Sequence, residues 1–102
     1  MDHIVLFDAF PEKSHLRRAH FDTHLDFLKK NSANIRSAGP LLSHTGTGEA
    51  MGGLWIVRGL TDSEVSERVE MDPLFATGLR RTWRVHPWIR VFDDGASTGI
   101  RP

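Results

Sequence analysis

Residues 53–64, GLWIVRGLTDSE, contain the strand-to-helix junction that decides the fold. The first eight residues, 53–60, predict a β-strand in which Leu54, Ile56 and Leu60 share one face. The TDSE segment that follows is a capping box, with Thr61 or Asp62 as the N-cap, and it predicts a helix that runs to about Met71. This junction therefore predicts one strand and one helix, and the remaining elements can be placed on either side of it.

On the N-terminal side, residues 3–10 are apolar and rich in β-formers, which predicts a buried strand ended by Pro11. Ser14 can cap a helix over residues 14–31, because its apolar and histidine positions recur at helical spacing. Ile35–Leu42 is expected to form a second strand, and its Gly39-Pro40 step indicates an edge, a bulge or a bend. The polar, glycine-rich residues 43–53 are expected to form a loop.

On the C-terminal side, Asp72 followed by Pro73 predicts a capped helical turn. Residues 80–92 alternate in polarity and are expected to form the last strand. The polar residues 94–102 are expected to be a loose tail. A single domain over residues 1–93 is therefore expected, followed by that tail.

The element order is β-α-β-β-α-β, which predicts an α+β, ferredoxin-like fold with a four-stranded antiparallel sheet and two helices on one face. Strand side chains alternate between faces, so the set Leu54, Ile56 and Leu60 opposes a second apolar set. We expect the first set to face the helices and the second to lie on the open face, the second set being Val5, Phe7, Trp55 and Val57. An apolar open face would be covered by a second copy, so a homodimer is expected.

The composition excludes several classes of function. The 102 residues contain 13 basic and 13 acidic side chains, which argues against a nucleic-acid or anionic-membrane partner. The chain has no cysteine, which excludes disulfides and thiolate sites and fits a reducing compartment. Without a basic, cleavable leader or an apolar stretch of about 20 residues, we expect a cytoplasmic protein with no membrane span.

His20 and His24 lie four residues apart on one helix face, a spacing that can chelate zinc. The glutamate of the metalloprotease motif is missing, and His44 or His86 could add a third ligand only through the fold, so no metal is expected. His24 lies within the apolar stripe of the helix. It is either a core histidine bonded to a backbone carbonyl or a catalytic base. By spacing alone, Asp72 is only a helix cap.

Five short motifs resemble the YCII-related (YciI-like) family in the same order: HLDFL, AGPLL, GGLWIV, MDPLFATGL and VHPWIRVF, across about residues 1–92. The resemblance implies a dimeric α+β barrel with a His–Asp pair in a pocket between helices and sheet. The positions that match this pair are His24 and Asp72. Many members carry an arginine three residues before the histidine; Phe21 stands there and Arg17 lies one turn earlier, which implies a less charged ligand.

The resemblance thus implies a small organic ligand bound near His24 and Asp72 by Arg17, Phe21, Gly39 and Phe75. It implies a cofactor-free lyase or isomerase, like the dehydrochlorinases and muconolactone isomerases of the same architecture. Two alternatives stay open. The pair could be structural in a non-catalytic binding or accessory protein, or the chain could bind haem through His24 or His86, as other dimeric α+β barrels do. No cofactor is expected on the first two interpretations.

Overall fold

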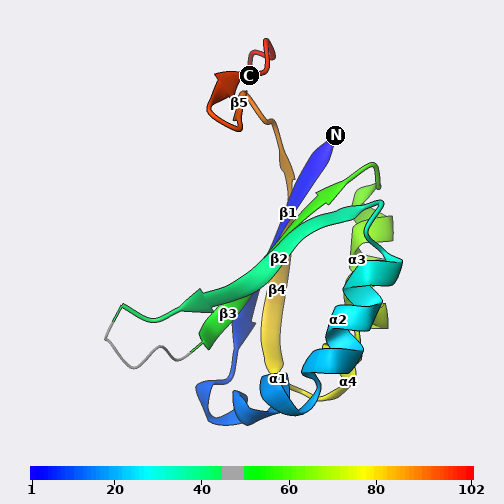
Figure 1. Cartoon of the computed structure of the whole chain (residues 1–102), viewed down its shortest axis with the longest axis vertical. Coiled ribbons are helices and arrows are strands. Elements are labelled where there is room, and N and C mark those ends of the chain that lie inside the picture. The colour runs from blue at the N-terminus through cyan, green and yellow to red at the C-terminus, as the bar shows by residue number, and fades with distance from the viewer. Residues whose placement is uncertain (45–49) are drawn as a thin grey trace.

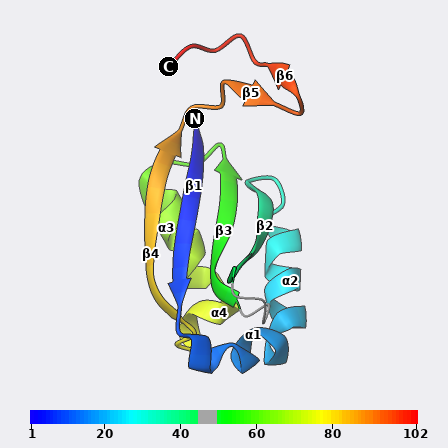
Figure 2. The same cartoon turned by 90° about the vertical axis from the view of Figure 1, so that its left-hand side faces the viewer.

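The computed structural model of the protein describes residues 1–44 and 50–102. Its main sheet is antiparallel, with the strand order β2-β3-β1-β4 (Figures 1 and 2). These strands are β1 (Asp2–Ala9), β2 (Ile35–Leu42), β3 (Ala50–Arg58) and β4 (Arg80–Trp88). The predicted ferredoxin-like α+β fold is confirmed. Residues 50–53, expected to end a loop, belong instead to β3, and residues 45–49 of that loop lie outside the described residues.

The helical elements are the 3-10 turn η1 (Pro11–Lys13), α1 (His15–Ala19), α2 (Phe21–Lys30), α3 (Asp62–Met71) and α4 (Pro73–Ala76). Helices α2, α3 and α4 lie on one face of this sheet, and the segment that contains η1 and α1 lies at its lower end (Figures 1 and 2). The single helix expected over residues 14–31 is wrong, because the backbone leaves helical geometry at His20, with φ −111° and ψ 17°. Ser14 stands at the N-cap position of α1, but its side chain makes no capping hydrogen bond. Its backbone is helical and its N–H donates to the Pro11 carbonyl, which continues the 3-10 turn. No helix in the described ranges is both long and apolar enough to cross a membrane.

The junction between β3 and α3 forms as its sequence predicts. Gly59 takes a φ of +79°, a left-handed conformation that glycine adopts without strain, and it ends β3. The Thr61 hydroxyl then accepts from the Glu64 N–H, and the Glu64 carboxylate accepts from the Thr61 N–H. This reciprocal capping box starts α3 directly above the sheet.

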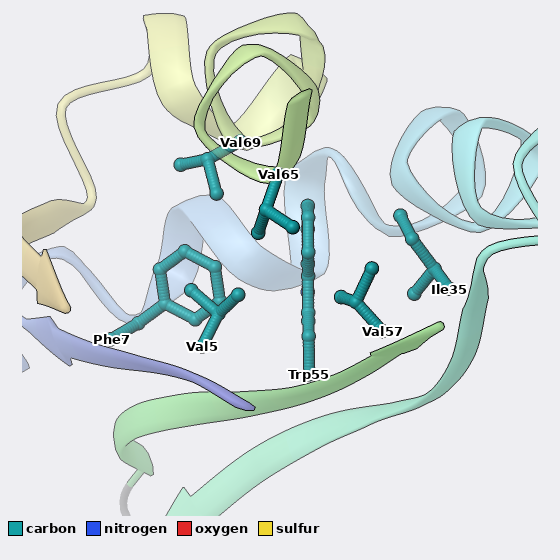
Figure 3. Close-up of a cluster of buried hydrophobic side chains, with 7 residues drawn as sticks. All are labelled: Val5, Phe7, Ile35, Trp55, Val57, Val65 and Val69. Carbon is teal, nitrogen blue, oxygen red and sulfur yellow. The ribbon is translucent and has the colours of Figure 1, made fainter. Parts of the chain in front are cut away.

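The core lies between the sheet and α3 (Figure 3). Trp55 stands at its centre, and Val65 and Val69 of α3 point down toward the sheet (Figure 3). The other buried members come from the strands: Val5, Phe7, Ile35 and Val57. The expected assignment of the two strand faces is therefore reversed, since Trp55 faces the helices and Leu54 and Ile56 lie on the open face. Both sets are apolar, so alternation alone could not say which one the helices cover.

The expectation that β2 tolerates Pro40 at an edge is confirmed, because β2 is the edge strand next to β3. Its register with β3 shifts at both ends of the pairing. Gly52 of β3 lies where a Cβ atom would come within 1.9 Å of the Phe7 carbonyl oxygen, so only glycine fits there. Gly52 therefore lets β3 lie close to the Phe7 carbonyl of β1, next to the candidate site.

The chain beyond β4 differs from expectation. The last strand of the sheet ends at Trp88 rather than at residue 92. A separate hairpin follows, β5 (Phe92–Asp93) with β6 (Ala96–Ser97), and it stands beyond the end of the sheet (Figure 2). Arg90 anchors its start, because this guanidinium donates to both Asp2 and Asp93. Part of the segment expected to be loose is thus paired, and the domain boundary at residue 93 stays a prediction.

Candidate active site

His24 and Asp72, 48 residues apart in sequence, are hydrogen-bonded in the structure. His24 lies on α2, and Asp72 is the residue that joins α3 to α4. The distance between His24 Nδ1 and Asp72 Oδ1 is 2.8 Å. The Asp72 side chain is fully buried, whereas 14% of the His24 side chain is exposed. With Nδ1 donating to an ionised Asp72, Nε2 on the other side of the ring carries the free lone pair.

The buried Asp72 carboxylate is held by three donors. Oδ1 also accepts from the Leu74 N–H at 3.0 Å, which makes Asp72 the N-cap of α4, as predicted. Oδ2 accepts from Arg80 Nη2 at 2.8 Å. Burial raises the pKa of Asp72, but the His24 hydrogen bond, the Arg80 charge and the Leu74 N–H together hold that pKa below the ordinary aspartate value. Asp72 is therefore an ionised hydrogen-bond acceptor with a fixed orientation.

Arg80, the first residue of β4, completes this network and was missed in the sequence. Its guanidinium carbon lies 3.9 Å from the centre of the Phe7 ring and 5.4 Å from that of Trp55, so the cation is stacked on aromatic side chains. Burial lowers the pKa of Arg80, and its ion pair with Asp72 offsets part of that effect. No motif marks this arginine, because only the antiparallel pairing of β4 with β1 brings it over Phe7.

A cavity of about 270 Å³ lies beside this network, between α1 and α2 on one side and β2 and β3 on the other. His24 and Arg80 line it together. Most of its wall is apolar, from both the helices and the sheet: Phe7, Leu25, Leu28, Trp55 and Leu74. A largely apolar cavity with a few convergent polar groups is the usual form of a small-molecule site.

Three of the four residues expected to bind the ligand line this cavity: Arg17, Phe21 and Gly39. The fourth, Phe75, does not; it lies on the exposed side of α4, and its ring packs edge-on against Trp83 at 5.6 Å. Arg17 Nη2 donates to the Gly52 carbonyl at 3.4 Å. With Arg80 also present, the cavity carries two guanidinium groups, more positive charge than the phenylalanine at position 21 suggested.

The other histidines singled out in the sequence do not join His24. His20 is half-buried at the break between α1 and α2, and His44 is exposed. His86 is exposed on β4, where it pairs with Ile4 of the open face, so it lies across the sheet from His24. Within residues 1–44 and 50–102, no group of three or more potential ligands is arranged to hold a metal ion.

A second His–Asp pair, which the sequence did not reveal, lies at the N-terminal end of β1. His3 Nε2 and Asp62 Oδ1 are 2.5 Å apart. Here the burial is reversed, since the His3 side chain is 4% exposed and that of Asp62 is 72% exposed. His3 Nδ1 is buried without a partner among the described residues. This pair joins β1 to the first turn of α3.

Comparison with known families decides the identity. The YCII-related domain matches residues 1–89, nearly the whole chain. The chain belongs to the YCII-related domain family. The predicted resemblance is therefore confirmed, and the His24–Asp72 network lies inside the matched region of this YCII-related protein.

One solved structure is similar over most of both chains. It is 5-chloro-2-hydroxyhydroquinone dehydrochlorinase (TftG) from Burkholderia phenoliruptrix AC1100, in complex with 2,5-dihydroxybenzoquinone. The identity is 28%, the TM-score is 0.77, and the alignment covers 87% of this chain and 94% of TftG.

A second solved structure, of At3g17210 from Arabidopsis thaliana, is 14% identical with a TM-score of 0.48, over 91% of this chain and 97% of that one. Such a likeness is too distant to inform function. No curated protein sequence matches the chain.

Proposed function

We propose that this YCII-related protein is a cofactor-free lyase or isomerase that uses His24 as a general base on a small organic substrate. The observation that carries the proposal is the 2.8 Å bond from His24 Nδ1 to a fully buried Asp72, with His24 lining an apolar cavity. TftG, whose structure is similar, is a dehydrochlorinase, which supports an elimination or a related proton transfer.

The reaction needs only proton transfers. Asp72 fixes the imidazole tautomer and orients the ring, which leaves the lone pair on Nε2. Nε2 takes a proton from a hydroxyl or an acidic C–H of the substrate, and the electron pair left behind moves into the conjugated system. In a lyase that acts on a chlorinated hydroquinone, the proton first returns to the chlorine-bearing carbon and gives the keto tautomer. Removal of a second proton then expels chloride and forms the quinone, with net loss of HCl. In an isomerase the proton on Nε2 returns to a different carbon.

Chloride release and deuterium exchange test this proposal. The protein is incubated in D₂O with 5-chloro-2-hydroxyhydroquinone and with a panel of unchlorinated hydroxyquinones, and chloride and C–H signals are followed by electrode and NMR. We expect catalysed turnover of at least one compound and its loss in His24→Asn. A His24→Asn variant that keeps the wild-type rate on every compound would contradict the role of His24 as the base.

A structural role for the pair is the alternative, and one observation favours it for Asp72. The same carboxylate caps α4 and neutralises a buried arginine, so it supports the fold whether or not the protein is an enzyme. His24 has no such second task among the described residues. A loss of more than about 3 kcal/mol in the free energy of unfolding of His24→Asn, the range of a broken buried pair, would support the structural interpretation, and a loss of no more than about 1–2 kcal/mol supports the enzyme.

We also propose that the open sheet face pairs with a second copy. Apolar side chains from the two central strands lie opposite each other there, in the register pairs Ile4 with Ile56 and Leu6 with Leu54. Light scattering should give the mass of a dimer, and Leu6→Lys should give a monomer because a charge cannot be buried there unpaired. Met71→Lys, at an exposed site on the helix layer, is the control. A monomeric wild-type protein would overturn this pairing.

A further inference from the structure

We propose that Arg17 and Arg80 form a two-guanidinium clamp that binds a planar organic anion, with the anionic oxygen of the ligand between them. This inference rests on the proposed function and deepens it, because it names the class of substrate. It also gives Arg80, which no sequence motif marks, a role in recognition as well as in holding Asp72.

Arg80 has a donor that the protein does not use. Its side chain is only 7% exposed, and Nη2 is bonded to Asp72. Nη1 is buried and has no hydrogen-bond partner among the described residues. A buried donor without an acceptor is costly, and such groups are uncommon unless a ligand or water completes them. Arg80 lines the cavity, so an oxygen atom of a bound ligand could supply the missing acceptor.

Arg17, on α1, presents the same feature to the cavity. Its Nη1 is also buried without a partner in the described part of the chain, and its Nη2 makes only the long bond to Gly52. Burial and the nearby charge of Arg80 both lower the pKa of Arg17. Both guanidinium groups therefore line the same cavity, and each has a buried Nη1 without a hydrogen-bond partner among the described residues.

The charges of the site favour an anion. Asp72 neutralises Arg80, whereas Arg17 makes no ion pair with any described residue. With a neutral His24, the cavity holds one uncompensated positive charge inside largely apolar walls. A bound oxyanion would neutralise that charge and relieve the repulsion between the arginines.

The walls favour a flat, conjugated ligand. Phe7 and Trp55 line the cavity, and the guanidinium carbon of Arg80 lies 3.9 Å from the centre of the Phe7 ring. A phenolate, an enolate or an aromatic carboxylate spreads its charge over a planar group that two guanidiniums can contact through parallel N–H bonds. An oxyanion held there also lies beside His24, since Arg80 and His24 share Asp72.

Binding of 4-nitrophenol tests the clamp, because its phenolate absorbs in the visible range. Titrations at a pH where the probe is ionised are compared with titrations of the neutral 4-nitroanisole and of benzoate. We expect the phenolate to bind at least about tenfold more tightly than 4-nitroanisole, as a charge-assisted site requires. Binding of benzoate as well would extend the same clamp to carboxylates.

Arg17→Met should weaken phenolate binding by about tenfold and leave 4-nitroanisole binding unchanged. Arg18→Met is the matched control, because it removes the same charge from the next, exposed position of α1 and should change neither. Arg80→Lys, which keeps a cation beside Asp72, should also weaken the phenolate selectively. The clamp is overturned if the phenolate binds no better than 4-nitroanisole or if Arg17→Met weakens both probes alike.

His24→Asn separates this inference from the proposed function. It removes the proposed base and neither guanidinium, so phenolate binding should persist while turnover is lost. If the phenolate does not bind selectively but His24→Asn still abolishes turnover, the clamp is wrong and the assignment of His24 as the base is supported. If the phenolate binds selectively and His24→Asn keeps the wild-type turnover, the Arg17–Arg80 clamp is supported and the assignment of His24 as the base is wrong.

Discussion

The molecule contains two His–Asp pairs with opposite burial. In His24–Asp72 the carboxylate is fully buried and the histidine reaches a cavity. In His3–Asp62 the histidine is buried, the carboxylate is exposed, and His3 lies at the other end of β1 from the cavity-lining Phe7. The two pairs have the same chemical groups and differ in their surroundings.

The difference in burial suits His24–Asp72 to a catalytic role and His3–Asp62 to a structural one. A buried carboxylate with three donors can hold an imidazole in one tautomer and leave its other nitrogen free toward a ligand. An exposed carboxylate beside a buried ring joins a strand to a helix and offers no second nitrogen to a cavity. His3–Asp62 is thus an internal reference against which each property of His24–Asp72 can be measured.

The largest expected effect is on stability, at Asp72. Asp72→Asn leaves the buried Arg80 cation without its counter-ion and weakens the bond from His24, so we expect a loss of about 3–5 kcal/mol in the free energy of unfolding. Urea denaturation measures this loss. A loss below about 1 kcal/mol, the range of exposed ion pairs, would mean that the two pairs do not differ.

A smaller effect is expected in the pH dependence of folding stability, through the ionisation of Asp72. The pKa of Asp72 is lower in the folded protein than in the unfolded chain, so its contribution to stability is complete above the ordinary aspartate pKa of about 3.9. That contribution is lost as the pH falls below this value. Stability measured against pH should therefore fall less steeply on the acid side in Asp72→Asn than in the wild type. Equal slopes of stability against pH on the acid side in the two proteins would contradict a lowered pKa for Asp72.

The smallest effect is expected at Asp62. This carboxylate is exposed, and Asn keeps a side-chain oxygen that can accept from His3, so Asp62→Asn should cost about 0–1 kcal/mol. Urea denaturation beside Asp72→Asn gives the comparison directly. A cost equal to that of Asp72→Asn would show that burial of the carboxylate is not what distinguishes the pairs.

The sequence predicted the fold well because its signals were local. The capping box at Thr61 and the Asp72-Pro73 helix start are short patterns, and both are confirmed. The break at His20 and the face that Trp55 occupies were predicted wrongly. The first lies inside a continuous apolar stripe, and the second depends on which of two apolar faces the helices cover.

The candidate site was only partly predictable. The family motifs drew attention to His24 and Asp72, and the structure brings them together. Arg80 and His3 had no local signal, because their partners lie on other elements and meet them only through strand pairing and helix packing. Phe75 belongs to a family motif, but its ring packs against Trp83 and does not line the cavity, because the motif does not show which side of α4 carries Phe75.

The most direct test of the central claim is to measure turnover and unfolding together in His24→Asn and His3→Asn. Turnover means the chloride release or C–H exchange that the proposed function predicts for the wild type. We expect His24→Asn to lose at least about 100-fold in rate, the contribution of a general base, with a stability loss of only about 1–2 kcal/mol. His3→Asn should lose stability and keep its rate. Equal effects of the two substitutions on rate would contradict the assignment of His24 as the base.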